Sequence, residues 1–377
     1  MSFREELKAL DCGEVFDDPK TLASASHDTS LFEVRPQLVV LPRNEKDLEK
    51  LVTFATQNKG MMTLTARSGG TGMDGGALSE SVVLDFTKHF AGTKGFTKDT
   101  GTVLPGTYYR DFERESMKRN LLMPSYPASR EICTVGGMVA NNAGGELTLT
   151  YGKTADYVRE LRVVLSDGLT HIIKPLTTSQ LQEKLLETTF EGNLYRQIYK
   201  LIIENKVVIE KSKPRVTKNS AGYALWDIHN ERDGIFDLTR LFTGSQGTLG
   251  LITEITFGLM HPPSRSQMLV VFLDDLSQLP AIVKTTLATS PTTFESYDDK
   301  TLALALRFFF EFIRRLGVRK TLSIAFGNLS AGWSLMRKGL PKLVLQITWN
   351  GEDVHALKQK AEELKHALTP FSPRLSH

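Results

Sequence analysis

The 377-residue chain has few cysteines, no long apolar run and almost no net charge. Its two cysteines, Cys12 and Cys133, are too few for a disulfide framework or a cysteine metal site, and they fit a reducing compartment. A net charge of +3 does not favour nucleic acid or a membrane surface as a partner. The longest apolar candidate, residues 302–313, is interrupted by Arg307 and Glu311, so we expect no transmembrane segment.

The first ten residues are charged and contain no apolar core of the kind found in secretory signals, so a cytoplasmic protein is expected. The length allows two or three domains, and the composition is ordinary for a globular protein. The pattern of elements changes at Pro262-Pro263. We therefore predict a first domain over residues 1–260 and a second over residues 261–377.

The sequence does contain a loop of almost bare backbone, residues 67–76, with five glycines in ten residues. It follows an apolar run, residues 61–66, that is typical of a strand. Glycine removes side chains that would block the backbone, so amide N–H groups can close on an anion such as a diphosphate. A glycine-rich turn without a ligand is the alternative from this segment alone.

Gly70, Gly72 and Gly75 fit the G-x-G-x-x-G pattern of Rossmann domains. That pattern requires a helix to begin within the glycines, with its N-terminus facing the pyrophosphate. Here the loop leads instead into residues 82–86, which are largely β-branched and apolar and are predicted to form a strand. The order strand, loop, strand argues against a nicotinamide site.

Three further segments are rich in small or turn-forming residues. Residues 126–145 contain two Gly-Gly pairs and could pack against a flat ligand, or form a Gly/Ala helix inside the core. Residues 244–250 lead into a predicted strand at 251–257 and fit either a ligand-contacting loop or a tight turn. Residues 218–223 contain Lys218, and a lone lysine beside a turn is usually a solvated surface group.

Hydrophobic periodicity predicts the other elements. In the first domain we expect strands at 37–41, 161–165 and 171–174, and helices after Asn44 and at 108–119, 179–187 and 193–203. In the second domain we expect strands at 268–273, 293–297 and 343–349, and helices at 278–288, 302–316 and 352–367.

Together these segments resemble the FAD-binding domain of the vanillyl-alcohol oxidase (PCMH-type) superfamily, above all its D-lactate dehydrogenase and glycolate oxidase FAD-subunit type. The resemblance runs from Asp28 to Leu259 and includes the entry segment at residues 28–32, Tyr151-Gly152 and residues 218–223. It implies an α+β fold in which two subdomains hold an extended FAD. A partial ferredoxin-like α+β cap domain would follow.

The resemblance also implies the cofactor contacts. Backbone amides of the first glycine loop would hold the diphosphate, and the other segments would line the rest of the cofactor. Some members of the superfamily bind FAD covalently through a histidine in this loop, and Thr71 at that position implies noncovalent FAD. The implied cofactor residues are Ser68, Gly69, Gly70, Thr71, Gly72, Gly76, Ala77, Ser129, Thr134, Gly137, Asn142, Val158, Gly247 and Ile252.

The implied reaction is oxidation of a small-molecule 2-hydroxy acid, such as D-lactate or glycolate. A base takes the hydroxyl proton while the α-hydrogen passes as hydride to flavin N5, and an electron acceptor or partner subunit then receives the electrons. Many members carry His-x-Gly-Asp-Gly-Asn-x-His and Glu-His-Gly segments that supply metal ligands and the base, and this chain has neither.

His355 and His366 are expected to lie on solvated surface, because they are eleven residues apart on one helix. We therefore assign no metal site and no catalytic base. The alternative to a flavin dehydrogenase is a noncatalytic FAD-binding or electron-transfer module of a larger complex.

Overall fold

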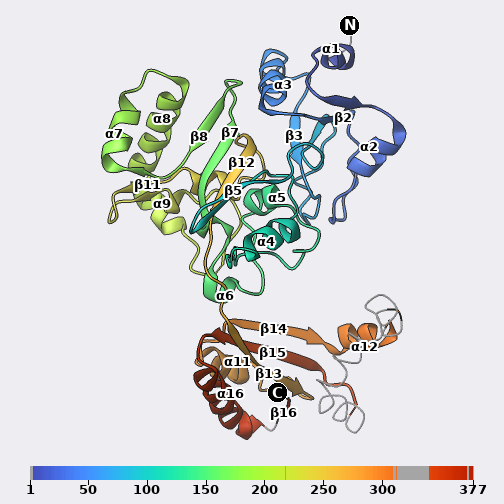
Figure 1. Ribbon diagram of the computed structural model, residues 1–377, viewed down its shortest axis with the longest axis vertical. Coiled ribbons are helices and arrows are strands. Elements are labelled where there is room, and N and C mark those ends of the chain that lie inside the picture. The colour runs from blue at the N-terminus through green and yellow to red at the C-terminus, as the bar shows by residue number, and fades with distance from the viewer. Residues whose placement is uncertain (1–2, 217, 309–310, 312–338, 372, 377) are drawn as a thin grey trace. The chain divides into compact units, whose positions relative to one another are not determined.

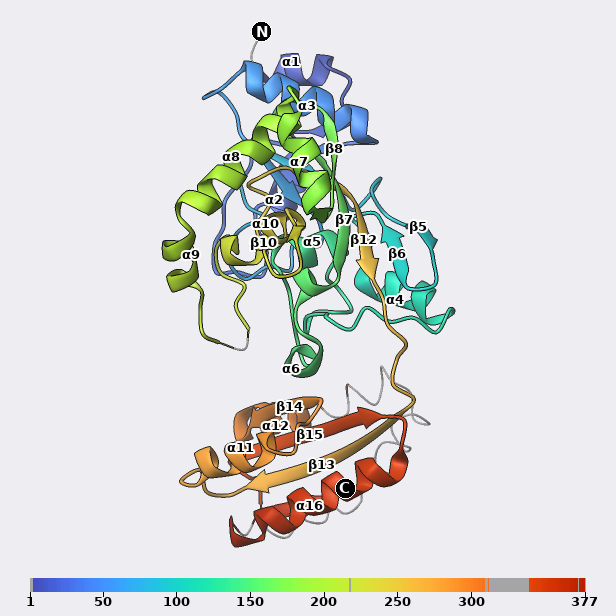
Figure 2. The same ribbon diagram turned by 90° about the vertical axis from the view of Figure 1, so that its left-hand side faces the viewer.

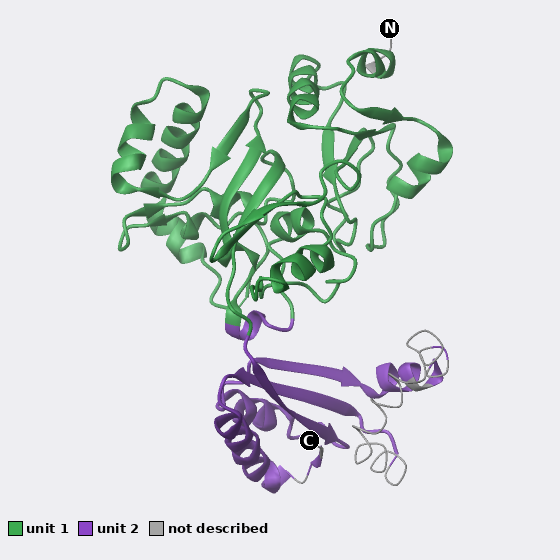
Figure 3. Ribbon diagram, viewed as in Figure 1, with its two compact units in different colours: residues 1–145, 151–262 green, residues 146–150, 263–377 purple. Residues whose placement is uncertain are grey.

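The computed structural model describes residues 3–216, 218–308, 311, 339–371 and 373–376. The chain divides into two compact units (Figure 3). Unit 1 comprises Met1–Gly145 and Tyr151–Pro262, and unit 2 comprises Glu146–Thr150 and Pro263–His377. The sequence pattern did not predict that residues 146–150 would group with the second unit.

Unit 1 begins with a four-stranded sheet in the order β1-β2-β4-β3, of which Figure 1 labels β2 and β3. Strand β1 is antiparallel to β2, whereas β2, β4 and β3 are parallel. Buried Leu38, Leu48 and Val82 belong to its core, which confirms the predicted strand before Asn44 and the helix after it. The elements are α1 (Phe3–Ala9), β1 (Glu14–Phe16), α2 (Pro19–Ala25), β2 (Leu38–Leu41), α3 (Glu45–Gln57), β3 (Leu64–Arg67) and β4 (Val82–Asp85).

The glycine loop connects two parallel neighbours. Leu64 of β3 lies opposite Val82 of β4, and the chain between the strands, residues 68–81, contains no helix. The predicted order strand, loop, strand is therefore confirmed. The helical crossover in this sheet is β2-α3-β3, and it precedes the loop, so the arrangement that a Rossmann phosphate site needs is absent from it.

A five-stranded antiparallel sheet in the order β5-β6-β12-β7-β8 forms the middle of unit 1. Ile255 at its centre faces Val103 on one neighbouring strand and Leu161 on the other. The predicted hairpin of strands at 161–165 and 171–174 is confirmed. The elements are β5 (Thr93–Phe96), β6 (Thr100–Val103), α4 (Tyr109–Met117), α5 (Val135–Ala140), η1 (Thr154–Asp156), β7 (Val158–Val164), β8 (Thr170–Ile173) and β12 (Leu251–Gly258). The short helix α6 (Thr148–Tyr151) belongs to unit 2 except for Tyr151.

A small sheet in the order β10-β11-β9 and four α-helices complete the described part of unit 1. The predicted helices at 179–187 and 193–203 are confirmed as α7 and α8, which lie side by side (Figures 1 and 2). The elements are β9 (Leu176–Thr177), α7 (Thr178–Leu186), α8 (Phe190–Glu204), α9 (Lys206–Ser212), η2 (Leu225–Asp227), β10 (His229–Asn230), β11 (Ile235–Phe236) and α10 (Thr239–Phe242).

Helix α3 joins the two larger sheets. Glu45 in its first turn accepts hydrogen bonds from Arg162 of β7, at 2.8 and 2.9 Å, and from the hydroxyl of Thr253 of β12, at 2.7 Å. One turn later, Glu49 accepts bonds from the amide and hydroxyl of Thr170 on β8. These contacts hold the β3 edge of the first sheet beside the start of β12.

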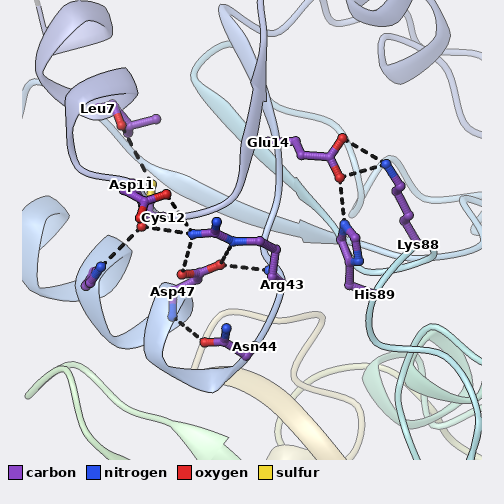
Figure 4. Close-up of polar contacts among 10 residues, drawn as sticks. Leu7, Asp11, Cys12, Glu14, Arg43, Asn44, Asp47, Lys88 and His89 are labelled. Carbon is purple, nitrogen blue, oxygen red and sulfur yellow. Dashed lines mark hydrogen bonds and ion pairs between the residues drawn. The ribbon is translucent and has the colours of Figure 1, made fainter.

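A buried ion pair fixes the start of α3 (Figure 4). Asn44 caps the helix by accepting a hydrogen bond from the amide of Asp47. The Asp47 side chain is only 4% exposed, and it accepts bonds from the backbone amide and guanidinium of Arg43, which also contacts Asp11. Burial of Asp47 opposes its ionisation, but the bonds from Arg43 outweigh burial and lower the pKa of the carboxyl. A separate cluster in the same view joins Glu14 to Lys88 and His89.

The substitution Asp47→Asn is expected to lower the free energy of unfolding by about 2 kcal/mol at pH 7, because an amide cannot accept all of the bonds from Arg43. A carboxyl with a lowered folded pKa stabilises the fold above its ordinary pKa of 3.8, and this contribution disappears as the pH falls through the folded value. The difference between the proteins should therefore shrink below about pH 4. Urea unfolding across pH measures it.

The matched control is Asp11→Asn, because Asp11 also pairs with Arg43 but its side chain is 79% exposed. Its backbone φ of +47° is one that asparagine adopts readily. We expect a change within about 0.5 kcal/mol at every pH. Equal losses in the two variants would contradict a special role for the buried carboxylate.

Unit 2 is a four-stranded antiparallel sheet in the order β14-β15-β13-β16, with α11 and α16 contributing to one core around buried Trp349. Apart from α12 after β14 and η3 after α16, the chain order β13-α11-β14-β15-α16-β16 and this strand order are those of the ferredoxin-like fold. The expected ferredoxin-like α+β fold is thus present, whereas only a partial cap domain was expected and β16 is a fourth strand that the pattern did not predict. The elements are β13 (Arg265–Leu273), α11 (Leu279–Leu287), β14 (Thr293–Asp298), α12 (Asp299–Arg307), β15 (Leu343–Gly351), α16 (Val354–Leu368), η3 (Thr369–Phe371) and β16 (Arg374–Ser376).

The helix predicted at residues 302–316 corresponds in part to α12, which ends at Arg307. Residues 309–310 and 312–316 of that prediction lie outside the described part of the chain. His355 and His366 both lie on α16 and are exposed. None of the helices in the described ranges is long and apolar enough to cross a membrane.

Candidate cofactor-binding site

A cavity of about 700 Å³ lies within unit 1. Three of the four segments singled out in the sequence line it, at residues 66–77, 127–143 and 246–252. Residues 66–77 lie at the end of β3 in the first sheet, and residues 246–252 lead into β12 in the second sheet. Each of these two sheets therefore contributes residues to the cavity wall. The cavity volume is within the usual range of pockets for small molecules and cofactors.

The glycine loop has its tightest point at Gly70, whose φ is +61°. A Cβ atom placed on Gly70 would lie 2.5 Å from a terminal nitrogen of Arg67. The guanidinium of Arg67 therefore packs directly against the backbone of the loop, and a side chain at position 70 would displace it. Burial lowers the pKa of Arg67, and the nearby carboxylates of Asp85 and Asp28 act in the opposite direction.

The loop presents a run of unused amides. Among the described residues, the backbone N–H groups of residues 70–73 donate no hydrogen bond within the protein. Gly69 differs, because its amide donates to the hydroxyl of Thr134 at 3.0 Å. Successive unpaired amides in a loop form a concave site for an anion. Within the predicted diphosphate contact Ser68–Gly72, the amide of Gly69 is therefore already paired within the protein, whereas the amides of Gly70, Thr71 and Gly72 are open to a ligand.

Two hydroxyls join the glycine loop to helix α5. The side chains of Ser68 and Thr134 lie 2.6 Å apart, and Thr134 immediately precedes the helix. Gly137 follows on the same side: a Cβ placed there would be 3.4 Å from the Thr134 hydroxyl and 3.7 Å from the Ser68 hydroxyl. The missing side chain at Gly137 therefore keeps open the part of the cavity beside these hydroxyls.

The third segment is held against the end of α5. The amide of Gln246 donates to the carbonyl of Ala140 at 2.9 Å, and its side-chain amide donates to Asn141 at 3.0 Å. Gln246 has a φ of +55°, which is uncommon for a residue other than glycine and is often found at functional sites. The side-chain oxygen of Gln246 would lie 3.0 Å from a Cβ on Gly76, so the first and third loops meet here.

Most of the predicted site residues lie together. The residues that line the cavity are Ser68, Gly69, Gly70, Thr71, Gly72, Gly76, Ala77, Ser129, Thr134, Gly137, Gly247 and Ile252. Asn142 and Val158 do not line it.

Asn142 is buried, and its side chain turns away from the cavity. Its amide oxygen accepts a hydrogen bond from the backbone of Ala155 at 3.0 Å, and its own carbonyl accepts one from Ser220. A φ of +46° at Asn142 reverses the chain direction after α5. Asn141 lines the cavity in its place, so the structure assigns Asn142 a structural contact within the protein.

Val158 lies at the end of β7 away from the cavity residue Ile252. Val158 pairs with Phe257, whereas the cavity residue Ile252 pairs with Val163. Five residues of strand separate the two pairs, or about 17 Å at ~3.3 Å per residue. With 1% of its surface exposed, Val158 belongs to the core of the sheet.

Sequence reasoning missed several residues of the lining. The cavity is also lined by Thr29, Arg67, Asn141 and Gln246, which were not among the implied cofactor residues although each lies in a segment singled out in the sequence. The fourth segment, residues 218–223, does not line the cavity but contacts residues adjacent to its wall. In that segment Tyr223 bonds the hydroxyl of Thr248, and Ser220 bonds the carbonyl of Asn142.

Few ionisable groups line the cavity. Within the described residues they are Arg67, Asp74 and Cys133. Burial raises the pKa of Cys133 to about 11, so this thiol is protonated at neutral pH. Arginine is a permanent cation. The lining is therefore suited to holding a flat, partly apolar anion, and it offers little for proton transfer.

Comparison with known proteins agrees with this site. Residues 36–174 match the family model described as FAD binding domain. The D-2-hydroxyglutarate dehydrogenase of Escherichia coli (strain K12) is 28% identical over 284 residues, which are 74% of this chain and 28% of that protein. The glycolate oxidase subunit GlcD of Bacillus subtilis (strain 168) is 27% identical over 306 residues, or 79% of this chain and 54% of that protein.

A D-lactate dehydrogenase of Anaerostipes hadrus is 28% identical over 67% of this chain and 42% of that protein. The solved structure of an alkyldihydroxyacetonephosphate synthase has the same fold, with a TM-score of 0.68 at 17% identity, over 99% of this chain and 60% of that one. This chain thus spans between about a quarter and just over half of the length of these relatives.

Proposed function

We propose that this chain, whose residues 36–174 match an FAD binding domain, holds FAD noncovalently in the unit 1 cavity for the oxidation of a 2-hydroxy acid. The observation that carries this proposal is the run of unused amides at residues 70–73, which lies on the wall of the cavity. Such a run suits the diphosphate of FAD. When bound, FAD would supply the acceptor for the hydride of the substrate.

The substrate class follows from the relatives. Three of them are named for D-2-hydroxyglutarate, glycolate and D-lactate. All three compounds carry a hydroxyl on the carbon next to a carboxylate. Their oxidation requires removal of a hydroxyl proton together with transfer of the α-hydrogen. We propose this class and no single member of it.

The side chains on the cavity wall bear on where the catalytic base for the proposed oxidation comes from. The side chains on the cavity wall include no histidine, glutamate, lysine or tyrosine within the described residues. His355 and His366 are exposed on α16. This observation supports the second candidate, in which the chain is a noncatalytic FAD-binding or electron-transfer module and another subunit completes the reaction. The name of the B. subtilis relative, a subunit, is consistent with such an arrangement.

Anaerobic reduction separates the two candidates. FAD-loaded protein is mixed with D-lactate, glycolate or D-2-hydroxyglutarate, and the oxidised flavin absorbance is followed. Bleaching by at least one of them supports the dehydrogenase. If dithionite bleaches the flavin and none of the three acids does, the module is supported instead. Acid precipitation of the same sample should leave the flavin in the supernatant, because Thr71 occupies the position of the covalent histidine.

A further inference from the structure

A loop outside the matched family region closes on the glycine loop. Residues 26–34 fold back on themselves: the amide of Val34 donates to the carbonyl of Ser26, and His27 pairs with Glu33 in an antiparallel bridge. The family match begins at residue 36, so this loop precedes it. We call residues 26–34 the entry loop.

The entry loop contacts the glycine loop at three points. At one end, a terminal nitrogen of Arg67 donates to the carbonyl of His27 at 2.6 Å. At the other, a Cβ placed on Gly75 would be 3.2 Å from the ring of Phe32. Between them lies Thr29, which also lines the cavity.

We propose that Thr29 is a positioning residue for the FAD diphosphate, acting through the peptides of Thr71 and Gly72. Its amide donates to the carbonyl of Gly72 at 3.1 Å. Its hydroxyl lies 2.7 Å from the carbonyl oxygen of Gly72 and 3.0 Å from that of Thr71. One residue thus contacts two successive carbonyls of the loop that carries the unused amides.

Peptide geometry explains how Thr29 orients the unused amides. In a trans peptide the N–H group points opposite to the C=O group. The carbonyls of Thr71 and Gly72 are turned toward Thr29, so the amides of Gly72 and Met73 are turned away from it. Glycine at position 72 would otherwise allow these peptides to rotate at little cost. Thr29 therefore keeps two of the four unused amides in a fixed direction before the anion arrives.

The experiment compares the FAD affinity of the full chain and its Thr29 variants by quenching of flavin fluorescence. Thr29→Val keeps the shape and the backbone amide but removes the hydroxyl, and we expect FAD to bind about fivefold more weakly. Thr29→Ser keeps the hydroxyl and should bind within twofold of the wild type. The control Thr63→Val alters another exposed threonine in unit 1, outside the cavity wall, and should leave the affinity unchanged.

Three results would overturn the proposal. The first is a Thr29→Val protein that binds FAD as tightly as the wild type. The second is a Thr29→Ser protein whose FAD affinity falls as much as that of Thr29→Val. The third is a melting temperature of FAD-free Thr29→Val that is low enough for unfolding to explain its weaker FAD binding. The inference rests on the proposed cofactor site but not on the substrate. Failure of the hydroxy acids to bleach the flavin would leave the affinity comparison intact, whereas a wild type that binds no FAD would refute the site itself.

Discussion

Gly136→Ala is expected to destabilise the FAD-free protein by about 2 kcal/mol or more. A Cβ on Gly136 would lie 2.6 Å from the Cβ of Pro105 and 2.7 Å from its carbonyl oxygen, distances at which the backbone itself must move. That carbonyl also accepts the amide of Gly136 at 2.8 Å, so separation of the two segments breaks this bond. Overpacking costs about 1–3 kcal/mol. The lost hydrogen bond costs about 1 kcal/mol more.

Helix propensity acts in the opposite direction, because alanine is favoured over glycine by up to about 1 kcal/mol within a helix. The expected loss is therefore the balance of these effects, and it is a large part of the 5–15 kcal/mol typical of a folded domain. Urea unfolding of the apo protein measures it. Gly137→Ala is the control in the same helix, since its Cβ has no neighbour closer than 3.4 Å. If the two alanine variants unfold alike, α5 does not pack on Pro105 as described.

Local patterns predicted the elements around the site because each is specified by nearby residues. Asn44 caps α3 through the amide of Asp47, three residues away. The run at Val82–Asp85 is β-branched and apolar enough to form a buried strand without a helix before it. The second of these short-range signals, together with the apolar run before the glycine loop, was sufficient to argue against a Rossmann site and to place the loop between two strands.

The parts of the site that sequence patterns missed depend on long-range contacts. Thr29 meets the glycine loop across more than 40 residues, and no local pattern marks such a partner. Asn141 and Asn142 are adjacent and identical, so the choice between them depends on the left-handed turn after α5. The position of Val158 away from the cavity wall follows from the register of β7 against β12, which is set by the pairing of two strands far apart in the chain.

In the second unit, too, the features that local patterns missed depend on long-range contacts. Strand β16 has only three residues, Arg374–Ser376, and is specified by its pairing with β13 rather than by its own pattern. The sheet order that identifies the ferredoxin-like fold comes from such pairings. A base for the oxidation could not be assigned from sequence, and the cavity wall in unit 1 does not supply a histidine or glutamate among the described residues.

Gly137→Leu should reduce the affinity for FAD at least 100-fold, because its side chain would fill the space beside the hydroxyls of Ser68 and Thr134 that we assign to the cofactor. The first atom of that side chain fits without a clash, at 3.4 Å from the Thr134 hydroxyl, so the fold itself is expected to tolerate the change. A 100-fold loss of affinity corresponds to about 2.8 kcal/mol of binding free energy. The measurements are the flavin that copurifies with the protein and the dissociation constant from fluorescence quenching.

Gly137→Ala extends the test by giving a graded effect, and we expect about tenfold weaker binding from one methyl group that reaches the cofactor. The two neighbouring glycines of α5 then act on different properties: Gly136→Ala lowers stability through Pro105, whereas Gly137→Leu lowers affinity at unchanged apo stability. A Gly137→Leu protein that keeps wild-type affinity would place FAD elsewhere. A Gly137→Leu protein that fails to fold would leave Gly137→Ala to decide, because its methyl group has room in the apo structure.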